Sequence, residues 1–284
     1  MTHGIFNIRE VYAAITAIDI VLLQVLYRVK LSIDDEDKLK FFTSFPPDPV
    51  NRGSLQLRTG ALIGLPSTFY YRSVGDVEHS SIFVGQENVD WNSPAGEELQ
   101  NALVLSDKAK AFVIAREIYD VKSFSVHTKI VLLSFNLILA YLSGAALNRK
   151  FFLTLRLKPW ARFCVFSALA GAWTVAYIAV SDALHCWYEN RADESVAQLR
   201  KIYAEGGVEY YDAVLQRNRA LRTLLGSKGN KQYTYYGNVV SVWRNPSVQL
   251  TSRRDNLQKY LAQYEHKETV NPPDDDQKQA DTAA

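Results

Sequence analysis

Cysteine, methionine and histidine are scarce in this chain of 284 residues, which has 2 cysteines, 1 methionine and 5 histidines. Two cysteines are too few for the disulfide framework of a small secreted protein, or for a zinc or iron–sulfur site built on several thiolates. Cys164 and Cys186 stand 22 positions apart, so they form no CxxC pair that could hold copper between two thiolates. These absences exclude several classes of protein and select none.

An excess of positive charge is also missing. The chain has 32 Lys and Arg against 30 Asp and Glu, which gives a formal net charge of +2. A protein that binds nucleic acid usually shows a clear basic excess on one face, so no nucleic-acid partner is expected. The length suits one large domain or two small ones.

Charge disappears altogether from two stretches, residues 130–148 and 163–181, each 19 residues long. A helix needs about 20 apolar residues to cross the hydrocarbon core of a bilayer. Two such runs joined by only 14 residues predict a transmembrane helical hairpin over residues 130–181, embedded in the lipid bilayer. Small residues such as Gly144 and Gly171 lie in these runs and favour close helix packing, either within the hairpin or against a client protein.

The orientation of the hairpin is only weakly indicated. Its connection carries five basic residues and no acid: Arg149, Lys150, Arg156, Lys158 and Arg162. The positive-inside rule favours the matrix or cytoplasmic side for such a connection. The flanks at the other end also carry several Lys and Arg, so both orientations stay open.

A third apolar stretch, residues 11–27, predicts an N-terminal membrane helix within residues 1–30. It contains Asp19, and an ionised aspartate at the centre of a membrane costs about 2.5–3.5 kcal/mol on insertion scales. The segment therefore either spans with Asp19 paired inside a bundle or lies at the membrane surface. No small-residue cleavage site follows it, which disfavours a secretory signal.

The remaining sequence predicts a mainly helical globular domain with a small antiparallel sheet, so the fold class is an α+β membrane protein. Short β-like runs separated by glycine and proline occupy residues 55–89. Ser93 and Ser106 are typical helix N-caps. After the hairpin, two helices are expected on either side of Gly206 and Gly207. The predicted regions are 1–30, 31–129 (ending in the first charged motif below), 130–181, 182–262 and a disordered tail at 263–284, which has too few apolar residues to pack.

Two charged motifs flank the predicted hairpin. Residues 116–120 are Arg-Glu-Ile-Tyr-Asp and residues 189–193 are Glu-Asn-Arg-Ala-Asp. A hairpin brings its two flanks together at one membrane surface, so the helices that carry these motifs are expected to be neighbours. This layout resembles the M48 family of membrane zinc metallopeptidases, which has an HExxH helix, two crossings and an ExxAD helix.

The resemblance fails at the metal ligands. Arg116 and Asp120 stand at the two histidine positions of HExxH, Glu117 stands at the general base, and Glu189 and Asp193 match ExxAD. A guanidinium stays protonated and only donates hydrogen bonds, so it repels a metal ion and binds carboxylates itself.

We therefore predict a pseudo-peptidase without catalytic residues, metal or cofactor, in which Arg116 pairs with Asp120 or Glu189. The alternatives are a membrane zinc peptidase with Glu117, Asp120 and Glu189 as substituted ligands, and two ordinary charged helix faces.

A more specific resemblance covers roughly residues 55–255. The stretches GALIGLPSTF, VDWNSPAGEELQNALVLS, AFVIAREIY, GGVEYYDAVLQRNRALRTLLG and YTYYGN resemble the transmembrane protein 177 family of the mitochondrial inner membrane. The resemblance implies a multi-pass, non-enzymatic assembly factor that supports maturation and stability of newly made cytochrome c oxidase subunit II, together with the assembly chaperone of that subunit. The family also has an arginine and a glutamate at Arg116 and Glu117, and it supplies no established binding residues to carry over.

Overall fold

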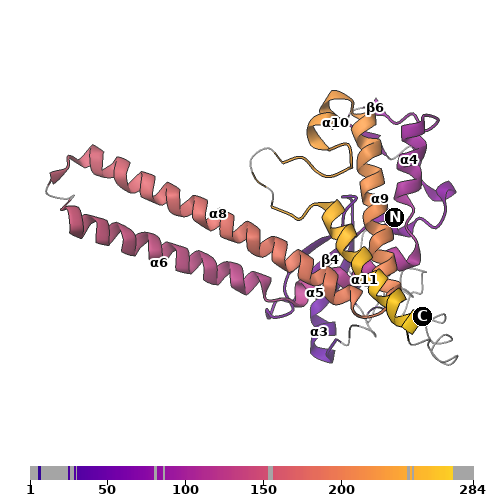
Figure 1. Ribbon diagram of the computed structural model, residues 1–284, viewed down its shortest axis with the longest axis horizontal. Helices are drawn as coiled ribbons and strands as arrows, with labels where there is room; N and C mark the ends of the chain where they lie inside the picture. The colour runs from indigo at the N-terminus through magenta and orange to yellow at the C-terminus, as the bar shows by residue number, and fades with distance from the viewer. Residues whose placement is uncertain are drawn as a thin grey trace.

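The computed structural model describes residues 6–7, 25, 29, 31–79, 82–85, 87–152, 156–241, 244 and 246–270. Two long helices project together from a globular part that contains the remaining helices and all the strands (Figure 1).

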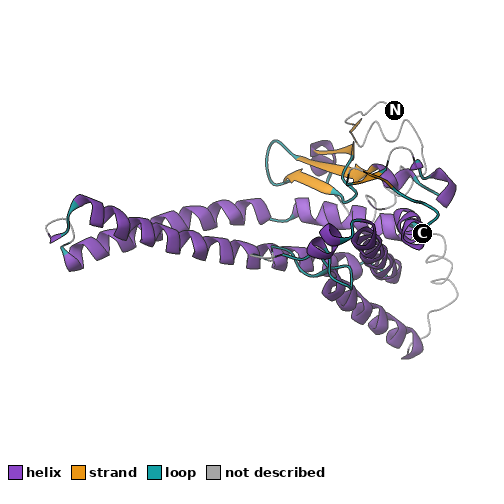
Figure 2. Ribbon diagram, turned by 90° about the horizontal axis from the view of Figure 1, so that it is seen from above, coloured by secondary structure: helices purple, strands orange, loops and turns teal. Residues whose placement is uncertain are grey.

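The projecting helices are α6 (Ser125–Phe151) and α8 (Pro159–Ala197), which lie side by side in both views (Figures 1 and 2). Both are long and apolar enough to cross a membrane. In their most apolar 18-residue windows, 6% of the α6 residues and none of the α8 residues are buried. The apolar side chains therefore face outward, as lipid-facing side chains do, and do not form the core of a soluble domain.

Polar contacts inside the apolar stretches join the two helices. Asn136 Nδ2 donates to the carbonyl of Trp173 at 3.2 Å, and Trp173 Nε1 donates to Ser143 Oγ at 2.8 Å. A Cβ atom built on Gly144 would lie 3.7 Å from side-chain atoms of α8, so this glycine faces the partner helix. Gly171 has nothing within 4 Å of such an atom and faces away from the described chain. Gly144 therefore lies on the surface between the two helices, and Gly171 lies on an outward-facing surface.

The globular part is built around α9 (Lys201–Leu224), which packs most extensively against three helices. These are α4 (Pro94–Leu103), α5 (Asp107–Lys122) and α11 (Leu250–Val270); the short helices α3 (Ile33–Lys38) and α10 (Ser227–Gln232) lie nearer the edge. The predicted N-caps are confirmed, because Ser93 Oγ accepts from the Gly96 amide and Ser106 Oγ accepts from the Ala109 amide.

The main sheet is mixed, so the prediction of a small antiparallel sheet is wrong for it. Its strand order is β1 (Phe6–Asn7), β2 (Leu39–Ser44), β4 (Ala61–Pro66) and β3 (Val50–Gly53), and β2 runs parallel to β4. Only the separate pair of β5 (Phe83–Val84) and β6 (Glu87–Asn88) is purely antiparallel.

The error can be traced to two segments of the chain. The central strand β2 lies before residues 55–89, in a segment that follows an acidic run and was not expected to form a strand. Two β-like runs instead form turns and the 3₁₀ helix η1 (Ser67–Tyr70), followed by η2 (Val74–Asp76). A proline-rich loop after β2 sends the chain into β3, which pairs with the far side of β4.

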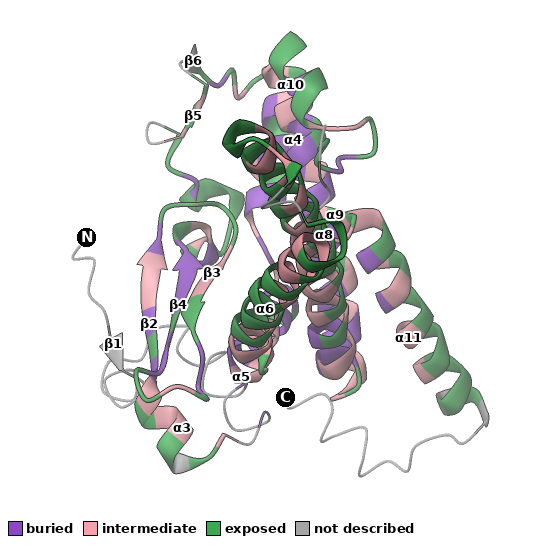
Figure 3. Cartoon of the chain, turned by 90° about the vertical axis from the view of Figure 1, so that its left-hand side faces the viewer, coloured by how far each residue is buried: buried purple, intermediate pink, exposed green. Residues whose placement is uncertain are grey.

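The core lies where the sheet meets α5, α9 and α11. Phe41 and Ile63 from the sheet, Phe112 from α5, Tyr211 from α9 and Leu257 from α11 belong to one buried cluster. Figure 3 shows buried residues in the strands and domain helices, whereas α6 carries only exposed and intermediate colours.

Two residues at the end of the predicted N-terminal membrane segment also belong to this core. Val25 and Val29 are helical and buried in the main cluster. The rest of residues 11–27 lies outside the described residues.

The glycine pair was wrongly expected to separate two helices. α8 continues without interruption from the second apolar stretch to Ala197, and α9 contains both Gly206 and Gly207. A Cβ atom on Gly206 would lie 2.2 Å from the Lys108 carbonyl oxygen, and one on Gly207 would lie 2.6 Å from Leu257. The glycines therefore permit close contacts with the N-terminal end of α5 and with α11.

Helix α11 also extends past the predicted start of the disordered tail at residue 263, up to Val270. Tyr264 packs against the main core and donates its hydroxyl to the Ala197 carbonyl at 3.1 Å, which fixes this part of the helix. The rest of the predicted tail, residues 271–284, lies outside the described residues.

Candidate functional site

The two charged motifs lie on helices that pack against each other. Arg116, Glu117 and Asp120 are on α5, and Glu189 and Asp193 are on the part of α8 beyond the second apolar stretch. The prediction that these helices are neighbours is confirmed. The pairing within the site differs from the one expected.

Arg116 does not pair with Asp120 or Glu189. Its Nη2 lies 2.5 Å from Oε1 of Glu117, the next residue in the chain, and its Nη1 donates to the Tyr211 hydroxyl at 3.4 Å. Asp120 is bonded instead by Asn51 of β3, whose Nδ2 donates to Asp120 Oδ2 at 2.9 Å and to Glu117 Oε2 at 2.5 Å. The amide and the guanidinium together satisfy Glu117, whose side chain is only 2% exposed.

The cation of the second motif is Arg253, from the first part of α11. Its Nε and Nη2 donate to the two oxygens of Asp193 at 2.7 and 2.9 Å, which is a bidentate arrangement. Its Nη1 also donates to Glu189 Oε1 at 3.3 Å, while the amide of Val248 donates to Glu189 Oε2 at 3.0 Å. Both side chains of the Arg253–Asp193 pair are nearly buried, at 5% and 6% exposure.

Tyr211 of α9 links the two halves. Its hydroxyl lies 3.0 Å from both carboxylate oxygens of Asp193 and accepts from Arg116, while Arg253 lies over its ring at 5.0 Å. We call Arg116, Glu117, Tyr211, Asp193, Arg253 and Glu189 the arginine–carboxylate network. It ties α5, α8, α9 and α11 together just outside the apolar stretches.

The electrostatics of the network favour the ion-paired state. Burial acts to lower the pKa of Arg116, but the carboxylate of Glu117 opposes burial most strongly, and that pKa lies well above its usual value. Burial raises the pKa of Tyr211 well above its usual value, against the opposing effect of Arg253. Burial also acts to lower the pKa of Arg253, but the carboxylate of Asp193 opposes burial and that pKa lies above its usual value. Both arginines therefore stay charged and Tyr211 stays protonated at physiological pH.

A cavity of about 430 Å³ opens beside the network. Arg116, Arg217, Arg253 and Glu189 contribute to its wall. Arg217 is itself engaged, since its Nη2 lies 2.7 Å from Asp48 Oδ1 and its Nη1 donates to the Pro47 carbonyl. Acidic groups therefore balance the arginines of this cavity, so it has no strong preference for an anion.

The same residues suit a metal ion poorly. Two arginines and an asparagine already bind the carboxylates that would have to act as ligands, and a guanidinium beside a dication is repulsive. Within the described ranges, no three His, Cys, Asp or Glu side chains are placed to hold one ion. His185 lies 3.9 Å from Glu189, but His79 stacks on Trp91 and His127 packs against Phe124, away from the network.

Sequence reasoning missed Asn51, Tyr211 and Arg253. Tyr211 lies in GGVEYYDAV, which is part of a stretch on which the family resemblance is based. That stretch is a signal by which Tyr211 could have been predicted as a site residue. Arg253 and Asn51 had no such signal, because neither lies in a motif or in such a stretch and each is 60 or more positions away from the residue it binds.

The fold and site define a membrane protein in which an apolar helical hairpin is attached to a helical domain with a small mixed sheet and a buried ionic network. The chain belongs to the transmembrane protein 177 family, whose sequence profile matches residues 42–275. The family assignment made from the quoted stretches is thereby confirmed.

Relatives in vertebrates cover most of the chain. The human transmembrane protein 177 is 37% identical over 226 residues, which is 77% of this chain and 70% of that protein. The mouse protein is 37% identical over 222 residues with the same coverage, and the zebrafish protein is 30% identical over 242 residues, or 80% and 74% of the two chains. No solved structure matches the chain significantly.

Proposed function

We propose that this protein is a non-enzymatic assembly factor of the mitochondrial inner membrane that supports maturation and stability of newly made cytochrome c oxidase subunit II. It acts with the assembly chaperone of that subunit. Membership of the transmembrane protein 177 family supports the proposal, because the resemblance described above implies this role.

The observation that carries the proposal is the outward-facing surface of the hairpin. Large apolar side chains of α6 and α8 are mostly exposed, for example Leu137, Tyr141 and Phe163, which are 61–75% exposed. Gly171 lies on this surface with open space above it. A small residue facing the bilayer lets another transmembrane helix approach closely, which suits a client that has just been inserted.

The network supports a role without hydrolysis. A peptidase of the M48 type needs carboxylates and imidazoles that can bind a metal and activate water. In this chain Glu117 binds Arg116 within α5, and Glu189 and Asp193 bind Arg253, so the two α8 carboxylates act as structural anions that fix α8 to the domain. The domain then holds the base of the hairpin in a defined position.

The proposal is tested by the lifetime of newly made subunit II. In mitochondria that lack this protein, pulse-labelled subunit II is expected to decay faster than the other labelled translation products in the same gel. Re-expression of the full chain should restore the lifetime. An unchanged lifetime of subunit II without the protein would contradict the proposal.

A further inference from the structure

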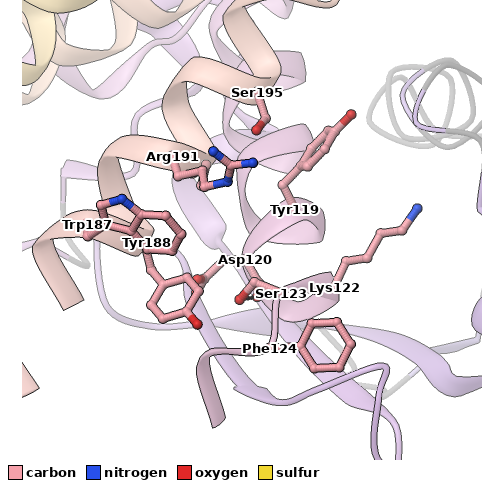
Figure 4. A pocket seen from close by; sticks show the side chains of 10 residues that line it. Tyr119, Asp120, Lys122, Ser123, Phe124, Trp187, Tyr188, Arg191 and Ser195 are labelled. Atoms are coloured by element: carbon pink, nitrogen blue, oxygen red, sulfur yellow. Dashed lines mark hydrogen bonds between the residues drawn. The ribbon is translucent and has the colours of Figure 1, made fainter. Parts of the chain in front are cut away.

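A second cavity, of about 310 Å³, lies at the base of the hairpin, away from the arginine–carboxylate network's own cavity. Figure 4 shows its walls: Trp187, Tyr188, Arg191 and Ser195 come from α8, and Tyr119, Asp120, Lys122 and Ser123 come from the end of α5. Phe124, which connects α5 to α6, closes one side. The cavity is thus formed where the domain joins both membrane helices.

The position of this cavity along the hairpin corresponds to the lipid headgroup region of a bilayer. Trp187 follows Ser181, the last residue of the second uncharged stretch, by six positions, which is about 9 Å along a helix. Phe124 precedes the first uncharged stretch by the same six positions. Both side chains are more than half exposed, at 52% and 60%, as expected for the aromatic residues that anchor proteins at a membrane interface.

The cavity carries a cation that no described acid neutralises. Arg191 lies over the Trp187 ring at 5.4 Å and forms no ion pair with the residues that the structure describes. Lys122 contributes its stem to the wall, and its ammonium points beyond the rim (Figure 4). Asp120 is the one acid among the lining residues, and Asn51 already donates to it.

Contacts within the protein hold Tyr188 and Trp187, two side chains that line the cavity, in place without a ligand. The Tyr188 hydroxyl lies 2.7 Å from Thr128 Oγ1, which joins α8 to the first turn of α6. Trp187 packs edge-on against Tyr188, with ring centroids 4.9 Å apart. A ligand would therefore enter a preformed site with an apolar side and a basic side.

We propose that this cavity binds the headgroup of an anionic phospholipid from the surrounding leaflet. Arg191 binds the phosphate, Ser195 can bond to a headgroup hydroxyl, and the acyl chains leave past Phe124 and Trp187 along the hairpin. Arg191 forms no ion pair with the described acids, so a lipid of net negative charge is favoured over a zwitterionic one. This inference depends on the membrane placement of the hairpin and not on the role in subunit II maturation.

Native mass spectrometry of the full chain in mild detergent tests the proposal, with phosphatidylglycerol, phosphatidylcholine and inorganic phosphate as separate probes. Phosphatidylglycerol should bind more tightly than phosphatidylcholine, and an excess of inorganic phosphate should not displace it. Arg191→Gln should weaken phosphatidylglycerol binding by about fivefold, the effect of one basic group near an anionic lipid surface. Arg191 is exposed, so this change should leave the fold intact.

Lys129→Gln is the matched control, because Lys129 is exposed at the same membrane surface and does not line the cavity. It should leave phosphatidylglycerol binding nearly unchanged. Equal losses in the two variants would mean general attraction to anionic lipid and would overturn the proposal. Equal binding of phosphatidylcholine, or displacement by inorganic phosphate, would overturn it as well. A photoactivatable phosphatidylglycerol gives a second measurement, and its cross-links should map to the segments around Phe124 and Trp187.

Discussion

Arg253 binds both carboxylate oxygens of Asp193, at 2.7 and 2.9 Å, across 60 residues of sequence. Asp193 closes the motif that resembles the third-ligand helix of a metallopeptidase. Here that motif is held by a guanidinium from α11, and Tyr211 connects the pair to Arg116 on α5. The site is therefore a structural joint between the hairpin and the domain.

Removing the guanidinium of Arg253 should strongly destabilise the folded protein. Arg253→Ala leaves the buried carboxylate of Asp193 with Tyr211 as its one side-chain partner among the described residues, and Glu189 loses one of its donors. Breaking a buried ion pair by removing one partner costs about 3–5 kcal/mol. Thermal unfolding of the full chain in mild detergent should show a large drop in Tm.

The adjacent Arg254 provides the control for this change. It pairs with Asp212 and Asp255 on an exposed surface, where such pairs contribute about 0–1 kcal/mol. Arg254→Ala should therefore shift the Tm only slightly. Equal shifts in the two variants would argue against a buried anchor at Arg253.

Arg116→Ala should also destabilise the domain, by less than Arg253→Ala. The change removes the charged partner of Glu117, but Asn51 still donates to that carboxylate. A lost hydrogen bond to a buried charged group costs about 1–3 kcal/mol. The double variant Arg116→Ala/Asn51→Ala should cost more than the two single changes added together, as measured by Tm. An unchanged Tm for Arg116→Ala would contradict the network.

Gly206→Ala tests the contact between α9 and α5. The new methyl group would lie 2.2 Å from the Lys108 carbonyl oxygen, and this is backbone that cannot rotate away. Overpacking of this kind costs about 1–3 kcal/mol, which outweighs the gain in helix propensity. Gly75→Ala is the control, since its nearest neighbour would be at an ordinary 3.7 Å. A Tm for Gly206→Ala at or above that of the wild-type chain would refute the close contact.

Stability should fall at alkaline pH because of buried tyrosines. Burial raises the pKa of Tyr210 from 10.0 to about 12. Between these values the folded state keeps a proton that the unfolded state has released, so the contribution is full below pH 10 and is lost as the pH rises towards 12. One such group changes the free energy of unfolding by at most about 1.4 kcal/mol per pH unit. Tyr210→Phe should flatten the decline of Tm over this range, and an unchanged slope would count against it.

Gly171→Leu should weaken association with subunit II and leave membrane insertion intact. The leucine fills the open space on the outward face of α8, where nothing in the described chain contacts it. Co-isolation of labelled subunit II with a tagged chain measures the effect. Gly144→Leu is the contrasting variant, because it clashes with the partner helix and should disturb the hairpin itself. Normal co-isolation with Gly171→Leu would exclude this face as the contact.

The sequence predicted those parts of the fold that depend on local patterns. The uncharged runs gave α6 and α8, and the serine N-caps gave the starts of α4 and α5, because lipid and unpaired helix amides impose strong local requirements. The predictions of an antiparallel sheet and of a helix end at the glycine pair were wrong, because these features do not depend on local patterns. The parallel pairing of β2 with β4, and the close approach at Gly206, depend on segments that are distant in sequence.

The candidate site shows the same limit. The packing of the two helices that carry the motifs was predicted correctly, since the hairpin places its two flanks together. The partners of the carboxylates could not be predicted, because Arg253 and Asn51 come from elements on either side of the two motifs in sequence. The sequence showed that a cation was present at Arg116, and the structure shows that a second one, Arg253, binds the other motif.

The zinc content of the full chain, purified in mild detergent without chelators, tests the central claim most directly. Elemental analysis by mass spectrometry should find zinc far below one atom per chain, with the same result for Glu117→Gln and Glu189→Gln. One zinc atom per chain in the wild type, lost in both variants, would contradict the conclusion that Arg116 and Arg253 hold these carboxylates in place of a metal.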